Sequence, residues 1–141
     1  MKFEDFIKKG DAKKSSLDIF LIRSLVKTAK KDLEFLNDLK ITEKSSRKIM
    51  VGYYDILRSI LEAIASFDGY KIYSHEAFSY FLNEKGEKIL AIKFDRFRKI
   101  RNSINYYGQD ISIEETKDNV EEIKNMINIL INKYLKEYKW W

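Results

Sequence analysis

The sequence predicts an all-α fold, an antiparallel four-helix bundle with one additional short helix. Its 141 residues contain no proline and only five glycines. Long helices tolerate that composition, whereas a β-sandwich needs many more turn residues. Apolar residues also recur at spacings of three and four along several long stretches, as they do in amphipathic helices. The length predicts one domain over residues 1–141 with a substantial core.

The composition also limits the chemistry. No cysteine is present, which excludes disulfides, thiolate nucleophiles and cysteine-based zinc sites. The only histidine is His75, so one chain cannot build a multi-histidine metal site. We therefore expect neither a metal nor a cofactor. The net charge of +5 permits an anionic partner without requiring one.

The first elements are a short arm and a long helix. Residues 1–12 form a short N-terminal arm with an amphipathic segment before Gly10. Ser15 or Ser16 is the candidate N-cap of the first long helix, which runs to about Asn37. The residues expected to be buried on this helix are Leu17, Phe20, Leu21, Leu25, Ala29, Leu33 and Leu36.

The second long helix is expected to follow Thr42 as its N-cap and to continue to Phe67. Gly69 suits the left-handed position that ends a helix. Gly52 lies inside this helix, where it costs up to about 1 kcal/mol relative to alanine. Close helix packing at Gly52 would explain its presence.

Two more helices are expected in the middle of the chain. Ser74 can cap a short helix over residues 75–82, which a polar turn follows. The next helix runs from about Lys88 to Tyr106, and Gly108 ends it. The residues that share its apolar arc are Leu90, Phe94, Phe97, Ile100, Ile104 and Tyr107.

The last helix is expected over about residues 113–138, and its acidic first turns complement the helix dipole. Its apolar stripe is Val120, Ile123, Ile127, Leu130, Ile131, Tyr134 and Leu135. Residues 139–141 form a tail in which Trp140 and Trp141 are either disordered or packed on a neighbouring subunit.

Nothing in the sequence predicts a membrane protein. No apolar run approaches the roughly 18–20 residues of a transmembrane helix. The N-terminus carries Glu4 and Asp5 and lacks the apolar segment of a signal peptide. We therefore expect a cytoplasmic protein without a membrane partner.

Arg101 is the most informative residue, because it falls inside the apolar arc of its helix. Burying a guanidinium costs several kcal/mol unless it is paired. Arg98 and Asn105 lie about one turn away on the same edge, and together the three suit an oxyanion. The alternative is that Arg101 pairs with a carboxylate, and Asp55 and Glu62 of the preceding long helix are candidate partners for Arg98 or Arg101.

The segment Arg101-Asn102-Ser103-Ile104-Asn105-Tyr106 resembles the R-N-x-x-x-H signature of HEPN domains. The residues Asp68-Gly69-Tyr70-Lys71 and Ser74-His75-Glu76-Ala77 are similar to the "GY" turn and the "SHEA" helix start of archaeal HEPN proteins. The resemblance covers about residues 15–138.

This resemblance implies a homodimer that binds RNA or a nucleotide through Arg98, Arg101, Asn102, Asn105 and Tyr106. In HEPN ribonucleases the motif arginine and histidine of two subunits cleave RNA without metal. Here the arginine is Arg101, but Tyr106 stands at the histidine position. A phenol with a pKa near 10 is a poor general base at pH 7, so we expect ordinary ribonuclease catalysis to be lost.

Two alternatives accompany this binding function. The protein could be a metal-independent endoribonuclease in which Arg101 acts with Tyr106 or His75, although a hydrogen-bonding role at a helix start also explains His75. It could instead serve as the docking partner of a small nucleotidyltransferase, with the Tyr106 hydroxyl as an acceptor. A dense aromatic region either packs the core or stacks a base; it consists of Tyr53, Tyr54, Tyr70, Tyr73, Phe78, Tyr80 and Phe81.

Overall fold

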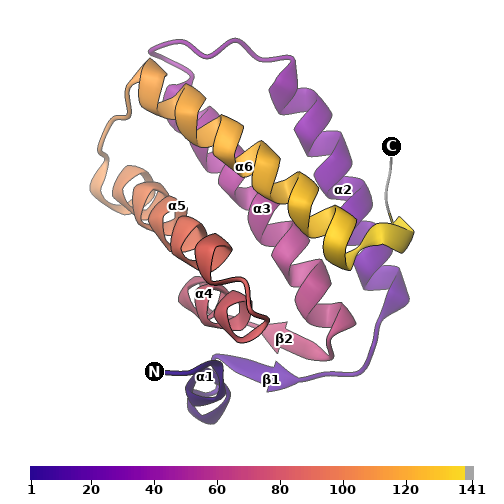
Figure 1. The fold of residues 1–141 in the computed structure, drawn as a ribbon. Coiled ribbons are helices and arrows are strands. Elements are labelled where there is room, and N and C mark those ends of the chain that lie inside the picture. The colour runs from indigo at the N-terminus through magenta and orange to yellow at the C-terminus, as the bar shows by residue number, and fades with distance from the viewer. Residues whose placement is uncertain (139–141) are drawn as a thin grey trace.

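The computed structural model describes residues 1–138, which form six α-helices, two short strands and a terminal 3-10 turn (Figure 1). The elements are α1 (Phe3–Lys9), β1 (Ala12–Lys14), α2 (Ile19–Asn37), α3 (Ser46–Phe67), β2 (Tyr70–Ile72), α4 (His75–Glu84), α5 (Lys88–Tyr107), α6 (Ile113–Tyr134) and η1 (Lys136–Tyr138). The prediction of a mostly helical fold is confirmed.

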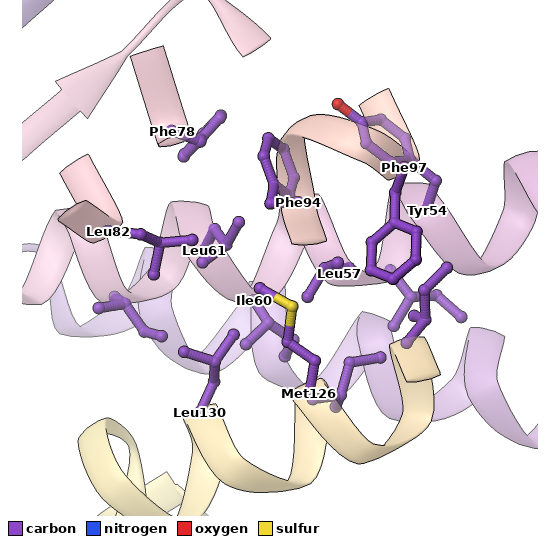
Figure 2. Packing of buried hydrophobic residues seen from close by; sticks show 14 of the residues in the cluster. Tyr54, Leu57, Ile60, Leu61, Phe78, Leu82, Phe94, Phe97, Met126 and Leu130 are labelled. Carbon is purple, nitrogen blue, oxygen red and sulfur yellow. The ribbon is translucent and has the colours of Figure 1, made fainter. Parts of the chain in front are cut away.

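The helix α3 lies at the centre of the molecule. It packs against α2 and α6 along its length and also contacts α5, while α4 packs mainly on α5 (Figure 1). Figure 2 shows the core around the middle of α3. The side chains labelled there are Tyr54, Leu57, Ile60 and Leu61 of α3, Phe78 and Leu82 of α4, Phe94 and Phe97 of α5, and Met126 and Leu130 of α6.

The two strands were not predicted. β1 and β2 pair antiparallel, with Ala12 opposite Ile72 and Lys13 opposite Lys71. Each strand is three residues long, too short for alternation to identify it in the sequence. Helix α1, expected as an arm, is part of the core, because Phe3 and Phe6 are buried against aromatic rings of β2 and α4.

Helix α2 begins later than predicted. Its N-cap is Asp18, whose carboxylate accepts a hydrogen bond from the Leu21 backbone N–H at 3.0 Å. Neither Ser15 nor Ser16 caps it. The Ser15 backbone instead continues the β ribbon by donating to the Gly69 carbonyl at 2.8 Å.

The buried face of α2 was also predicted wrongly in part. Leu17, Phe20 and Leu21 are exposed, Phe20 by 83%, whereas Ile22 and Val26 are buried. Of the other expected positions, Ala29 is buried, and Leu25, Leu33 and Leu36 are partly buried. Because α3 is the main packing partner of α2, only a narrow stripe of this helix is covered.

Gly52 allows close packing of α3 on α2, as predicted. A Cβ at this position would lie 2.9 Å from Leu36 Cδ1. The start of α3 differs from the prediction. Thr42 and Ser45 bond reciprocally in a turn before the helix, which begins at Ser46 instead of directly after Thr42.

The remaining helices follow the prediction closely. Ser74 occupies the N-cap of α4, although its side chain makes no capping hydrogen bond. On α5 the predicted arc is buried or partly buried except at Tyr107, which is 77% exposed at the helix end. Helix α6 ends at Tyr134, before the 3-10 turn, and Trp140 and Trp141 lie outside the described residues.

Among residues 1–138, no helix has the length and apolar character that crossing a membrane requires.

Candidate functional site

The candidate site lies where the C-terminal half of α5 faces α3 and the start of α4. The Arg101 side chain is partly buried there, with its guanidinium carbon 5.8 Å from the ring centroid of Tyr54 and 5.4 Å from that of Tyr106. Its Nη1 donates to the Asn102 Oδ1 at 3.3 Å and to the Tyr106 hydroxyl at 3.1 Å. The Nε–H is buried and has no hydrogen-bond partner among residues 1–138.

No carboxylate pairs with Arg101 within 4.0 Å in the described part of the chain. Asp55 and Glu62, the candidate partners, therefore do not pair with Arg98 or Arg101. Glu62 pairs instead with Arg58 of its own helix, at 3.3 Å. Burial raises the pKa of Asp55, while the positive charges of Arg58 and Arg101 act in the opposite direction. The direct hydrogen-bond acceptors of Arg101 are therefore neutral groups, and Asp55 interacts with it only electrostatically, without an ion pair.

Arg98 is partly neutralised. Its Nε and Nη2 donate to the Asp95 Oδ1 at 3.0 and 2.8 Å, and the Lys99 Nζ lies 3.1 Å from the other oxygen of Asp95. Burial acts to raise the pKa of Asp95, but the hydrogen bonds from Arg98 and Lys99 outweigh it and hold that pKa below its usual value. Asp95 thus carries a negative charge at neutral pH and fixes the position of Arg98.

A hollow of about 520 Å³ lies between α4 and α5 beside this ion pair. Its charged side includes Arg98 and Lys99, and its apolar side includes Ala91 and Ile92. The other residues that line it are Glu76, Ser79, Tyr80, Asn83, Lys88 and Asp95. This volume lies in the range of small-molecule sites.

Tyr54 connects His75 to Arg101. Its hydroxyl lies 2.9 Å from the His75 Nδ1, and its ring lies beside the Arg101 guanidinium. Burial lowers the pKa of His75 to about 4, and the positive charges of Arg58, Arg101 and Arg98 contribute. His75 is therefore neutral at pH 7. From the first residue of α4, its ring bonds to Tyr54 of α3. This agrees with the alternative in which His75 has a hydrogen-bonding role at the helix start.

Of the remaining predicted residues, only two contact Arg101. Asn102 and Tyr106 are hydrogen-bonded to it, and Tyr106 is 67% exposed. Asn105 is exposed on the last turn of α5, and no hydrogen bond reaches its side chain from residues 1–138. The structure thus brings Arg101, Asn102 and Tyr106 together but not Asn105.

Three contributors were missed by sequence reasoning. In the sequence, Tyr54 is one of many aromatic residues, and nothing in the pattern marks Arg58 on its own. Arg47 of α3 was also missed; its Nη2 donates to the Ile104 carbonyl at 3.3 Å near the end of α5. The spacing of Tyr54 and Arg58, four residues apart on α3, places them on one helix face and was the signal available.

Two basic residues in the first half of α5 pair with α6 and not with this site. Lys93 and Arg96 both pair with Glu122 of α6, the former at 3.9 Å. This pairing joins α5 to the acidic first half of α6. The charged groups that share the surroundings of Tyr54 and His75 with Arg101 are therefore Arg58, Arg98 and Asp55.

Within residues 1–138, no three side chains of histidine, aspartate or glutamate gather as metal ligands. Comparison with known protein families, with curated proteins and with solved structures gave no match. The similarity to HEPN domains therefore depends on the residues and spacings quoted above.

Proposed function

We propose that the protein is a HEPN-like four-helix-bundle homodimer that binds RNA or a nucleotide through the Arg101 site without ordinary ribonuclease catalysis. The observation that carries the proposal is the state of Arg101. Its guanidinium is partly buried, no carboxylate pairs with it in residues 1–138, and its buried Nε–H has no partner. A buried cation without a counter-ion is costly, and a phosphate oxyanion would supply the missing charge.

The surroundings of Arg101 support a nucleotide in particular. The Tyr106 ring is exposed beside the guanidinium, and an exposed ring can stack a base. A Tyr106 side chain that turned away would free Nη1 for a ligand. The hollow next to Arg98 offers further space with charged and apolar walls.

The same geometry argues against acid–base catalysis. The His75 pKa of about 4 makes this residue a weak base at pH 7, and its Nδ1 already bonds to Tyr54. Tyr106 is the other candidate, and its hydroxyl accepts a hydrogen bond from Arg101. Neither residue reproduces a histidine that titrates near neutral pH.

A second copy of the chain would complete the site. Tyr106 and Tyr107 are both largely exposed at the end of α5, where a partner subunit has access to them. In the proposed dimer Tyr107 contacts the partner, while the Tyr106 ring stays open to the ligand.

The test is retention of fluorescently labelled, mixed-sequence single-stranded RNA by purified protein in EDTA. Arg101→Ala is expected to weaken binding by about tenfold or more, because a charge-assisted phosphate contact contributes about 1.5–3 kcal/mol. Arg101→Lys retains the charge but not the planar fork, and is expected to restore part of the affinity. Arg23→Ala is the matched control, since Arg23 is exposed on α2.

Binding should also weaken as salt rises, as it does for phosphate contacts. If Arg101→Ala and Arg23→Ala bind RNA as the wild type does, Arg101 is not the phosphate ligand and the proposal is wrong.

The same samples separate the alternative functions. A ribonuclease that uses Tyr106 would cleave the RNA in EDTA and lose cleavage in Tyr106→Phe; the observation that favours it is the 3.1 Å contact of Arg101 with the tyrosine hydroxyl. A docking partner of a nucleotidyltransferase would neither bind nor cleave RNA.

A further inference from the structure

The outward face of the β1–β2 ribbon carries three side chains that no part of the Arg101 site uses. Along β2, Lys71 and the following Tyr73 lie on one side, while Ile72 between them is buried. Lys13 of β1 stands directly opposite Lys71, and its neighbour Ala12 is buried opposite Ile72. Lys13, Lys71 and Tyr73 therefore form one solvent-exposed set, here called the lysine–tyrosine face.

The lysines of this face lack a counter-ion. Like charges directly opposite each other on paired strands destabilise the ribbon. Among residues 1–138, no carboxylate lies within 4.0 Å of either ammonium group. Asp11, next to β1, pairs with Lys9 at 3.8 Å. The face thus carries two cations that an anionic ligand would neutralise.

Tyr73 adds an aromatic surface between these charges. The residue is 51% exposed, and the Nζ atoms of Lys13 and Lys71 lie over its ring, 6.0 and 5.6 Å from the centroid. A stacking ring flanked by two ammonium groups matches the base and the phosphates of a single-stranded nucleic acid. The six other members of the aromatic region are buried or partly buried, so Tyr73 is the member with an open ring.

The face is close to the Arg101 site. Tyr73 precedes His75 by two residues, a span of at most about 7 Å along the backbone. His75 bonds to Tyr54, whose ring lies 5.8 Å from the Arg101 guanidinium carbon. Figure 1 shows the ribbon next to α4, the helix that packs on α5.

We propose that the lysine–tyrosine face is a second RNA subsite, which stacks a base on Tyr73 and holds the flanking phosphates with Lys13 and Lys71. This inference rests on the proposed function and deepens it. The ligand is then a single strand that reaches from Arg101 past His75 to the ribbon, instead of one nucleotide.

The experiment measures fluorescence anisotropy of a labelled uridine dinucleotide and of a uridine dodecamer in EDTA. The wild type is expected to bind the dodecamer more tightly. Tyr73→Ala, and Lys13→Ala combined with Lys71→Ala, are each expected to weaken dodecamer binding about fivefold or more while leaving the dinucleotide affinity unchanged. Tyr73→Phe keeps the ring and should behave as the wild type; Lys27→Ala, at an exposed position of α2, controls for the lost charge.

Arg101→Ala is measured beside them and should weaken both ligands. If the ribbon variants bind the dodecamer as tightly as Lys27→Ala while Arg101→Ala loses both ligands, the second subsite is wrong and the proposed function stands. If Arg101→Ala has no effect on the dinucleotide, the proposed function fails, and the subsite linked to it fails with it.

Discussion

Arg101 shows how one side chain can be held without being neutralised. The rings of Tyr54 and Tyr106 flank the guanidinium, and its hydrogen-bond acceptors are the neutral Asn102 and the Tyr106 hydroxyl. Neighbouring Arg58 and Arg98 are each paired with a carboxylate on their own helix. Arg58 and Arg98 thus differ from Arg101 because each has a carboxylate three or four residues away on its own helix.

The sequence could predict that Arg101 is unusual, because helical periodicity places it within an apolar arc. It could not predict the partners, since these depend on how α3 is rotated against α5. Asp55 and Glu62 were both plausible from spacing, yet Glu62 meets Arg58. The contact of Tyr54 with Arg101 depends on the same packing of α3 on α5.

His75 makes the stability of the fold depend on pH. Its folded pKa of about 4 lies below the ordinary 6.5, so the unfolded chain binds more protons between these values. The free energy of unfolding is therefore expected to fall as the pH drops from about 7 to 4. Solvent reaches part of the ring, so we expect a loss of about 1–2 kcal/mol instead of the full value.

The measurement is urea unfolding of wild type and His75→Gln across this pH range. The difference between the two proteins separates the effect of His75 from that of Asp55. The raised pKa of Asp55 changes the free energy of unfolding with pH in the opposite direction. Equal pH dependence in the two proteins would show that His75 is not the titrating group.

At the scale of the elements, α2 shows where local signals mislead. Apolar residues extend around much of this helix, so more than one buried face fits the pattern. The β ribbon, which makes the helix start later, is too short to be predicted from the sequence. The helix α6 has one continuous stripe and an N-terminal cap at Ser112, and its predicted face is the observed one. A face can be predicted reliably only where the polar and apolar sides are distinct.

The start of α2 can be tested by deleting its cap. Asp18→Ala removes the hydrogen bond to the Leu21 N–H and is expected to reduce the free energy of unfolding by about 0.5–2 kcal/mol. Ser16→Ala is the control and should leave stability nearly unchanged, because α2 is not capped by Ser16. Denaturant unfolding measures both, and a larger loss in Ser16→Ala would contradict the observed start.

The contact of α2 with α3 can be tested at Gly52. A valine there would press on Leu36, whose Cδ1 lies 2.9 Å from the position of an added Cβ. Gly52→Val is expected to destabilise the protein by about 1–3 kcal/mol. The loss should shrink in a Leu36→Ala background, which a double-mutant cycle measures; strictly additive effects would show that the two residues do not press on each other.

At the scale of the whole molecule, the sequence predicted a mostly helical chain, and the described residues confirm it. Helix boundaries came within a few residues wherever a glycine or a clear cap ended the pattern, as at Gly69 and Gly108. Assembly is different, because no sequence pattern in this chain specifies an interface. The homodimer remains a proposal based on the resemblance and on the exposed tyrosines at the end of α5.

The dimer predicts an effect of charge at that end. Wild-type protein is expected to sediment as a dimer, and Tyr107→Asp to shift it toward monomer by placing a carboxylate in the interface. Ile129→Asp, on the exposed side of α6, should leave the dimer intact. A monomeric wild type, or a fully dimeric Tyr107→Asp, would be inconsistent with the proposed interface.

The central claim is that the Arg101 guanidinium binds a phosphate of RNA. Its most direct test is an NMR titration of nitrogen-15-labelled protein with single-stranded RNA, following the arginine Nε–H resonances and assigning that of Arg101 by its absence in Arg101→Lys. We predict that this resonance shifts progressively to saturation, because the Nε–H has no partner among residues 1–138 of the free protein. An Arg101 resonance that stays fixed while other signals report bound RNA would contradict the claim.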